Sequence, residues 1–172
     1  KDAAIIGGCA SLIYLAIGDI SYRLSLSRGG LNSKLITDMV AKSAAKKPKD
    51  EYKEKLDRMI DDGADWFMHQ DAEKVIIEKK HRQSLYADLI RPEKPSNIYV
   101  ICIHGYTSSP ANMGIYAKKY HELGYNVLLP SLRGHGDSEQ DFITMGWNDR
   151  LDVIEWINYI AERHPESKII LH

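Results

Sequence analysis

The chain has 172 residues, of which 44% are hydrophobic and 27% charged, and its formal net charge is −1. This length and composition are typical of a globular protein with a core of its own. Because a nearly neutral chain produces no strong positive field, we expect no nucleic-acid partner. The two cysteines, Cys9 and Cys102, are far apart, and neither has a second Cys or a His at ligand spacing. The sequence therefore indicates neither a disulfide framework nor a metal site.

The first part of the chain is uncharged from residue 3 to residue 18 and is bounded by Asp2 and Asp19. A helix that crosses a bilayer needs about 20 apolar residues, and this run is slightly shorter. Three readings are open: a membrane anchor, the core of a signal peptide, and a buried helix of a soluble domain. We favour an anchor or uncleaved signal-anchor over residues 1–22, because the small-x-small cleavage site expected after a signal peptide is poor here.

The next segment, residues 23–72, is predicted to be a helical extension. Apolar residues recur at helical spacing over residues 31–47 and again over residues 49–70, and Pro48 separates the two helices. Gly63 lies inside the second pattern and is expected to weaken or end that helix.

The hydrophobic period changes after residue 72, where strands and helices are predicted to alternate. Two short strands surround a polar break, and three near-continuous apolar runs, typical of strands buried on both faces of a sheet, alternate with two helices. The predicted strands are residues 75–78, 84–90, 97–104, 125–132 and 167–172, and the predicted helices are residues 113–124 and 145–165. The apolar side chains of the last helix are Leu151, Ile154, Ile157 and Ile160. This order predicts an open, mostly parallel α/β sheet with an antiparallel edge.

Unusual residues follow two of the predicted parallel strands, at the edge where ligands bind in such sheets. The first group is His104, Gly105, Tyr106 and Thr107. The second is Arg133, Gly134, His135, Gly136, Asp137 and Ser138. Both groups combine glycine with polar side chains, a composition that favours shaped turns. The sequence therefore predicts a functional site where these two loops meet.

Four stretches of the sequence are similar to a known family: HGYTSS, LLPSLRGHGDSE, MGWNDRLDVIEWINYI and the terminal KIILH. With them the chain resembles the α/β-hydrolase superfamily, and most of all the bacterial serine hydrolases with an N-terminal membrane anchor and a short helical segment before the core. The resemblance covers residues 75–172 and implies that residues 73–172 are the N-terminal portion of an α/β-hydrolase domain. It implies a serine hydrolase that cleaves a carboxylic ester or related acyl bond of a small molecule through an acyl-enzyme, without a cofactor.

The resemblance also implies a role for the first loop. The backbone N–H of Tyr106 would be one donor of the oxyanion hole, and Gly105 would let the substrate approach the main chain closely. His104 is interpreted as a residue that orients this loop by hydrogen bonding and not as the catalytic base. Thr107 is assigned to the shape of the loop.

The second loop is interpreted as a structural turn. Gly134 and Gly136 supply backbone freedom, His135 braces neighbouring loops, and Arg133 is expected to pair with Asp137 across the turn. Relatives usually carry Asp at the position of Ser131, so this chain lacks a carboxylate that could pair with Arg133.

No G-x-S-x-G sequence, the motif that carries the nucleophile in this fold, occurs in the 172 residues. By resemblance, residues 167–172 are the strand that leads into this turn. The chain would then supply half of an oxyanion hole and none of the triad of Ser, Asp or Glu, and His. We expect the chain alone to be inactive and to need the missing C-terminal part of the same domain.

Two further functions are open on the sequence. One is a non-catalytic α/β-hydrolase-like module that binds or scaffolds, and the other is a thioesterase or serine peptidase with the same apparatus. The resemblance also implies a protein that is anchored to the membrane at the extracytoplasmic face of a bacterial cell.

Overall fold

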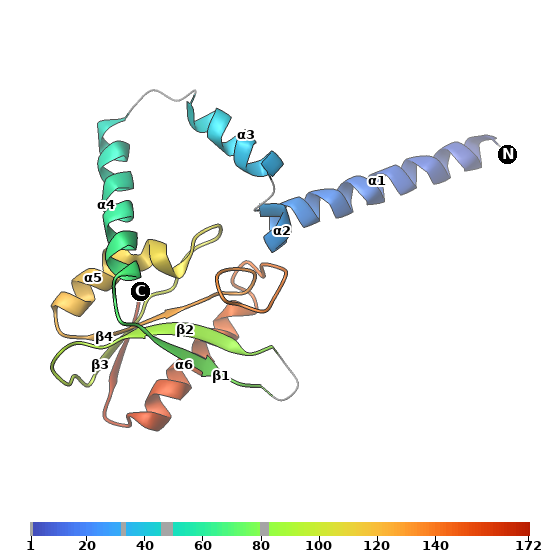
Figure 1. The fold of residues 1–172 in the computed structure, drawn as a ribbon. Coiled ribbons are helices and arrows are strands. Elements are labelled where there is room, and N and C mark those ends of the chain that lie inside the picture. The colour runs from blue at the N-terminus through green and yellow to red at the C-terminus, as the bar shows by residue number, and fades with distance from the viewer. Residues whose placement is uncertain (1, 32–33, 46–49, 80–82) are drawn as a thin grey trace. The chain divides into compact units, whose positions relative to one another are not determined.

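The computed structural model describes residues 2–31, 34–45, 50–79 and 83–172 (Figure 1). The chain divides into two compact units, Lys1–Lys47 and Pro48–His172. The second unit thus begins before residue 73, where the hydrolase portion is predicted to start, because the helix that precedes the sheet packs on another helix of the same unit.

The first unit consists of helices α1 (Asp2–Leu26), α2 (Arg28–Leu31) and α3 (Lys34–Ala45). Within the described residues, no helix is both long enough and apolar enough to cross a bilayer. The uncharged run ends inside α1 at Asp19, which forms an ion pair with Arg23 at 2.8 Å. The anchor predicted over residues 1–22 stays a prediction. The helix predicted over residues 31–47 corresponds to α3, and residues 32–33 and 46–47 lie outside the described residues.

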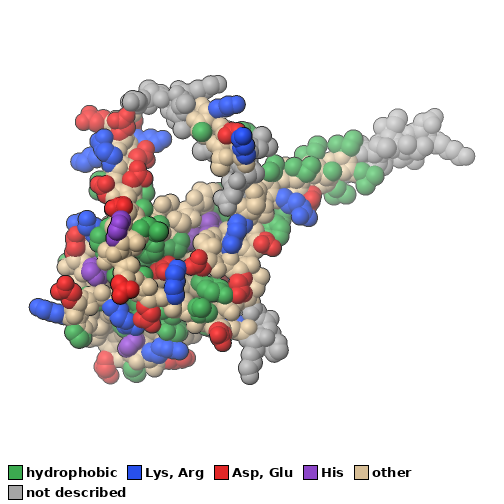
Figure 2. Space-filling view, in the orientation of Figure 1, with side chains coloured by type: hydrophobic (Ala, Val, Ile, Leu, Met, Phe, Trp, Pro, Cys, Tyr) green, Lys and Arg blue, Asp and Glu red, His purple; other side chains and the backbone are tan. Residues whose placement is uncertain are grey.

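The second unit opens with α4 (Glu51–Met68), which begins after Asp50. The Asp50 side chain accepts a hydrogen bond from the Tyr52 N–H at 3.0 Å, a typical N-cap. Charged side chains cover much of the exposed surface of this helix (Figure 2). Gly63 was predicted to weaken or end this helix; that it ends the helix is wrong, because Gly63 lies in its interior and is buried. A Cβ at Gly63 would lie 2.3 Å from the backbone nitrogen of Ile115, so the glycine permits a close contact between two helices.

Five strands form one sheet in the order β1-β2-β4-β3-β5. The strands are β1 (Glu73–Ile77), β2 (Leu85–Ile90), β3 (Ile98–Ile101), β4 (Asn126–Pro130) and β5 (Lys168–Leu171). Strand β3 pairs in parallel with β4 and β5, whereas β2 pairs antiparallel with both β1 and β4. The sheet is therefore mixed and not mostly parallel, because the β1–β2 hairpin adds two antiparallel pairings. The antiparallel edge and the parallel centre match the predicted order of elements.

Helices cover both faces of this sheet (Figure 1). The 3₁₀ helix η1 (Pro110–Met113) leads into α5 (Gly114–Glu122), and α6 (Asp149–Arg163) follows β4. One core cluster joins alternate strand residues such as Val100 and Val127 to Ala117 of α5. The other joins the intervening strand residues, such as Ile101, to Trp156 of α6. This alternation follows from the two-residue period of a strand.

Burial in α6 and β5 differs from what their apolar patterns indicate. Leu151 and Ile154 of α6 are 45% and 50% exposed, because Trp156 and Asp152 occupy the buried side of the helix. The last strand is not buried on both faces either. β5 lies at an edge of the described sheet, and its Leu171 is 52% exposed.

Candidate active site

The two loops singled out in the sequence lie at one edge of the sheet. Because β3 and β4 are parallel neighbours, the chain leaves both strands in the same direction. The hydrogen bonds of the sheet continue past β3 and β5: the Ile103 N–H donates to the His172 carbonyl at 2.8 Å. Tyr106 follows three residues later, so the first loop begins beside the end of β5. The carboxyl ends of the three parallel strands therefore meet here, as expected for a ligand site.

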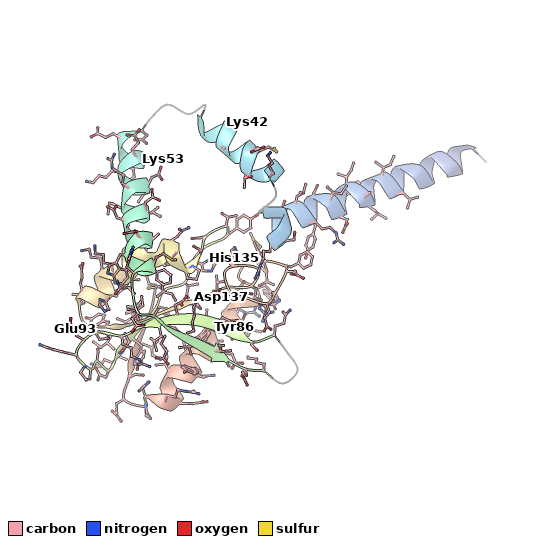
Figure 3. The ribbon with its side chains drawn as sticks, viewed as in Figure 1. Lys42, Lys53, Tyr86, Glu93, His135 and Asp137 are labelled. Carbon is pink, nitrogen blue, oxygen red and sulfur yellow. The ribbon has the colours of Figure 1, made fainter. Side chains whose placement is uncertain are left out.

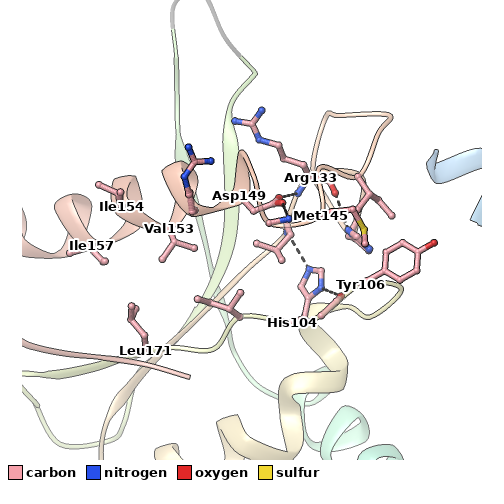
Figure 4. A pocket seen from close by; sticks show the side chains of 16 residues that line it. His104, Tyr106, Arg133, Met145, Asp149, Val153, Ile154, Ile157 and Leu171 are labelled. Carbon is pink, nitrogen blue, oxygen red and sulfur yellow. Dashed lines mark hydrogen bonds between the residues drawn. The ribbon is translucent and has the colours of Figure 1, made fainter. Parts of the chain in front are cut away.

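His104 joins the two loops (Figure 4). Its side chain is 2% exposed, and its Nε2 accepts a hydrogen bond from the Leu132 N–H at 3.2 Å. Its Nδ1 lies 3.0 Å from the Gly105 carbonyl oxygen. Since a backbone N–H only donates and a carbonyl only accepts, the ring is neutral with its proton on Nδ1. Burial, and to a smaller extent the charge of His135, lowers the pKa of His104. Both ring nitrogens of His104 thus form hydrogen bonds to backbone groups, one in each loop, and these bonds hold the two loops together.

The first loop turns sharply at its start. The Gly105 carbonyl accepts a second hydrogen bond, from the Ser108 N–H at 3.2 Å, which closes the turn around Tyr106 and Thr107. Thr107 has φ 57°, the left-handed region that L-residues rarely adopt. The Tyr106 side chain is 45% exposed. A non-glycine residue in this conformation is kept only where the surroundings fix it, and such positions cluster at functional sites.

The second loop is shaped by glycine. Gly134 has φ 76° and Gly136 has φ 49°. A Cβ at Gly134 would lie 2.8 Å from Ile143 Cγ1, so both the conformation and the packing require glycine. His135 lies between them with its Nδ1 2.9 Å from the Arg133 carbonyl oxygen. Its ring meets that of His104 edge-on at 4.9 Å, and among the described residues its buried Nε2 has no hydrogen-bond partner.

Arg133 ties the second loop to α6, and the predicted pair with Asp137 is wrong. Its guanidinium makes two hydrogen bonds to the Asp152 carboxylate, at 2.7 and 2.8 Å, and this contact raises the pKa of Arg133. Its backbone N–H donates to Asp149 at 3.2 Å. The other Asp149 oxygen accepts hydrogen bonds from the Thr144 hydroxyl and the Gly146 N–H. Asp149 and Asp152 were missed in the sequence, although two Asp residues three apart in the first turn of a helix lie on one face.

Asp137 (Figure 3) and Glu139 instead bind the edge hairpin. Lys74 of β1 lies 2.7 Å from the Asp137 carboxylate and 2.8 Å from that of Asp88. The Tyr86 hydroxyl donates to Glu139. The hydroxyl of Ser131, which replaces the usual carboxylate, accepts a hydrogen bond from the Asp137 N–H at 3.2 Å. The second loop is therefore bound on three sides: by His104 after β3, by the two Asp residues of α6, and by the hairpin.

A cavity of about 670 Å³ lies between these loops and α6 (Figure 4). Its polar lining includes Tyr106, Arg133, His135, Asp149 and Arg150. Apolar side chains line much of the rest, among them Met145, Val153, Ile154 and Leu171. Such a combination of apolar walls and few polar groups is typical of sites for small organic ligands. Among the described residues, no three His, Cys, Asp or Glu side chains lie together in a way that could hold a metal ion.

Two known proteins are similar to parts of this chain. No protein-family model matches the chain. The chain is 29% identical to a thermostable monoacylglycerol lipase of Bacillus sp. (strain H-257), in a match that covers 39% of this chain and 36% of the lipase. The solved structure of the Pyrococcus furiosus esterase Pf2001 matches 61% of this chain with a TM-score of 0.53 and 29% identity. The matched part of this chain is therefore similar in fold to the corresponding part of the esterase. The chain covers 41% of the esterase, and thus well under half the length of either protein.

Both similar proteins are named for cleavage of esters, and both matches are partial. The structure gives the positions of Tyr106 and of the loop residues, and their roles stay predictions.

Proposed function

We propose that the whole protein is a serine hydrolase of carboxylic esters, and that this chain supplies one half of its oxyanion hole. The observation that carries the proposal is the position of the Tyr106 loop. That loop is joined by His104 to the second loop and begins beside the end of β5. A backbone donor at this place lies next to the turn into which β5 would lead, where the nucleophile sits in this fold.

The reaction would proceed through an acyl-enzyme. A serine beyond His172 attacks the ester carbonyl, a histidine takes its proton, and the carbonyl oxygen becomes negative. The Tyr106 N–H donates to that oxygen. The intermediate then collapses: the C–O bond to the alcohol breaks, and the alcohol leaves with the proton from the histidine. Water, which gives a proton to the same histidine, attacks the acyl-enzyme, and the carboxylic acid and the free serine are released. The triad lies outside the 172 residues, so we propose that the chain alone is inactive and that the remainder of the domain is its partner.

The substrate is proposed to be a small molecule with an apolar acyl group. The apolar part of the cavity suits a hydrocarbon chain, and Tyr106 lies at its polar part. Because Leu171 also lines the cavity, the segment after β5 would complete its wall. Thioesters release a thiol and peptides release an amine, whereas esters release an alcohol. Since the same catalytic groups could cleave all three, thioesters and peptides serve as comparison substrates.

The test uses the full-length protein, an alkyl fluorophosphonate probe and p-nitrophenyl esters of different chain length. We expect covalent labelling of one serine beyond His172 and ester turnover faster than turnover of matched thioesters or peptides. Absence of labelling would overturn the proposal in favour of a binding or scaffold module. Faster thioester or peptide turnover would assign the protein to one of those two classes.

The role of Tyr106 is tested by variants that differ in the backbone donor. Tyr106→Pro removes the N–H, and we expect kcat to fall about 10²–10³-fold. Tyr106→Ala keeps the N–H and should stay within a few-fold of the parent. An amide-to-ester replacement at Tyr106 removes the same donor without the proline ring, if the proline variant does not fold. Equal activity of the ester analogue and the parent would contradict the assigned role.

The location at the extracytoplasmic face of a bacterial cell is likewise a proposal. Its support is the resemblance and a series of exposed apolar side chains on α1, among them Leu12, Tyr14 and Leu15. Fractionation of cells that express the full-length protein, with and without the residues before Asp19, tests it. Membrane association that does not depend on those residues would contradict this assignment.

A further inference from the structure

His172 is fixed to the sheet through its backbone. Its N–H donates to the Ile101 carbonyl at 3.0 Å, and its carbonyl accepts from the Ile103 N–H at 2.8 Å. The hydrogen-bond ladder between β3 and β5 therefore continues one residue beyond β5.

The His172 side chain is held by two tyrosines of α5. The Tyr120 hydroxyl lies 3.0 Å from His172 Nδ1, within hydrogen-bond distance. The Tyr116 ring is tilted against the imidazole with the centroids 4.3 Å apart, and the Tyr120 ring meets it edge-on at 5.7 Å. Both geometries are favourable for aromatic pairs. Tyr116 and Tyr120 are one helical turn apart, so they present neighbouring side chains to the same imidazole.

Tyr120 is itself held in place. It packs against the core cluster that contains Val100 and Cys102, and its ring stacks on that of Tyr125 with the centroids 6.4 Å apart. The backbone of Tyr120 accepts a hydrogen bond from the Tyr125 N–H. The Tyr120 ring is thus held against the core, and its hydroxyl contacts His172 at the end of β5.

We propose that Tyr116 and Tyr120 are positioning residues for the turn that follows His172. This inference rests on the proposed function, in which that turn carries the nucleophile. Displacement of a reacting group by about 1 Å costs on the order of 10²-fold in rate, so the residue from which the turn starts must be held closely. The contacts with Tyr116 and Tyr120 hold the end of β5 from the α5 side.

The contact with the Tyr120 hydroxyl can be removed from either side. Tyr120→Phe deletes the hydroxyl and keeps the ring, whereas His172→Phe keeps an aromatic ring against Tyr116 and deletes Nδ1. Because both variants break the same hydrogen bond, the double variant should be no worse than the poorer single variant. Tyr125→Phe is the matched control, since it removes a hydroxyl from the same aromatic cluster and leaves the contact with His172 intact.

The experiment measures kcat, KM and the rate of fluorophosphonate labelling in the full-length protein. We expect Tyr120→Phe and His172→Phe each to lower kcat and the labelling rate about tenfold with KM within twofold, and Tyr125→Phe to equal the parent. An active parent with an unchanged Tyr120→Phe variant would overturn the inference. Additive losses that follow the melting temperature would also overturn it, because they indicate a structural role only. An unlabelled, inactive parent would instead refute the proposed function.

Discussion

The guanidinium of Arg133 makes two parallel hydrogen bonds to the carboxylate of Asp152, with Nε at 2.7 Å from Oδ2 and Nη2 at 2.8 Å from Oδ1. The Asp152 side chain is 10% exposed and that of Arg133 24%. The pair joins the loop after β4 to α6, 19 residues along the chain. Planar bidentate geometry makes such a contact directional as well as favourable.

Breaking this pair should destabilise the protein. We expect Asp152→Ala and Arg133→Met each to lower the free energy of unfolding by about 2 kcal/mol, less than for a fully buried pair because Arg133 keeps contact with water. The double variant should lose at least about 1 kcal/mol less than the sum of the single losses. Urea unfolding of all four proteins measures this. Glu122→Ala, which breaks the exposed Lys119–Glu122 pair, is the control and should cause no measurable change. Simple additivity of the two losses would refute a direct coupling.

His104 makes stability depend on pH. Burial lowers the pKa of His104 in the folded protein, and the carbonyl of Gly105 and the charge of Asp149 oppose this only in part. Below pH about 6.5 the unfolded chain binds a proton here while the folded protein does not. Stability contributed by the neutral ring is therefore complete above that pH and is lost as the pH falls toward the folded pKa.

The measurement compares unfolding of the parent and of His104→Phe between pH 5 and pH 8. The parent should lose stability on acidification more steeply, by at most about 1.4 kcal/mol per pH unit for one proton. The two proteins have every other titratable group in common, including the neighbours His135 and Asp149. The difference between their two stability profiles therefore reports on His104. Parallel profiles would show that the pKa is the same in both states.

The sequence predicts the elements of the second unit better than their contacts. Alternation of apolar runs and amphipathic segments follows from local backbone geometry, so the strands and helices from residue 73 onward could be recognised. The partner of Arg133 could not, because Asp137 and Asp152 are both acidic and only the path of α6 decides between them. Gly63 was misread for a similar reason. Its helix propensity is local, whereas the contact with α5 that requires glycine is tertiary.

Gly63→Ala should destabilise the protein although alanine favours helix by about 1 kcal/mol. A Cβ at Gly63 would lie 2.3 Å from the nitrogen and 2.6 Å from the Cα of Ile115, both backbone atoms that cannot move independently. Separation of α4 from α5 would then expose part of the contact between Trp66 and the core. We expect a net loss of about 1–3 kcal/mol in urea unfolding. The control is Gly18→Ala in α1, where nothing lies within 4 Å of the added carbon. A stabilised Gly63→Ala variant would contradict the close contact.

Cys102 should be chemically inert in the folded protein. Its side chain is fully buried, and burial raises the pKa of the Cys102 thiol to about 12. At pH 8 only about one thiol in ten thousand would then be the reactive thiolate. Peptide mapping after iodoacetamide treatment should show no label on Cys102 in buffer and complete label in denaturant. Rapid native labelling would mean that β3 opens readily.

Replacement of glycine by alanine can cost stability through an unfavourable φ and through a steric clash, and a comparison of Gly134 with Gly124 separates the two effects. Both have positive φ, 76° and 81°, so alanine is conformationally unfavourable at either position by about 1–2 kcal/mol. At Gly124 nothing lies within 4 Å of the added carbon, whereas at Gly134 it meets the side chain and backbone of Ile143 at 2.8 and 2.9 Å. Gly134→Ala should therefore lose about 1–3 kcal/mol more than Gly124→Ala in urea unfolding. Ile143 also lines the cavity, so a shift of its side chain would change the shape of the proposed site. In the full-length protein, Gly134→Ala should therefore also lower the proposed ester turnover. Equal losses of stability at the two positions would show that the second loop has room to relax and does not hold the site in one conformation.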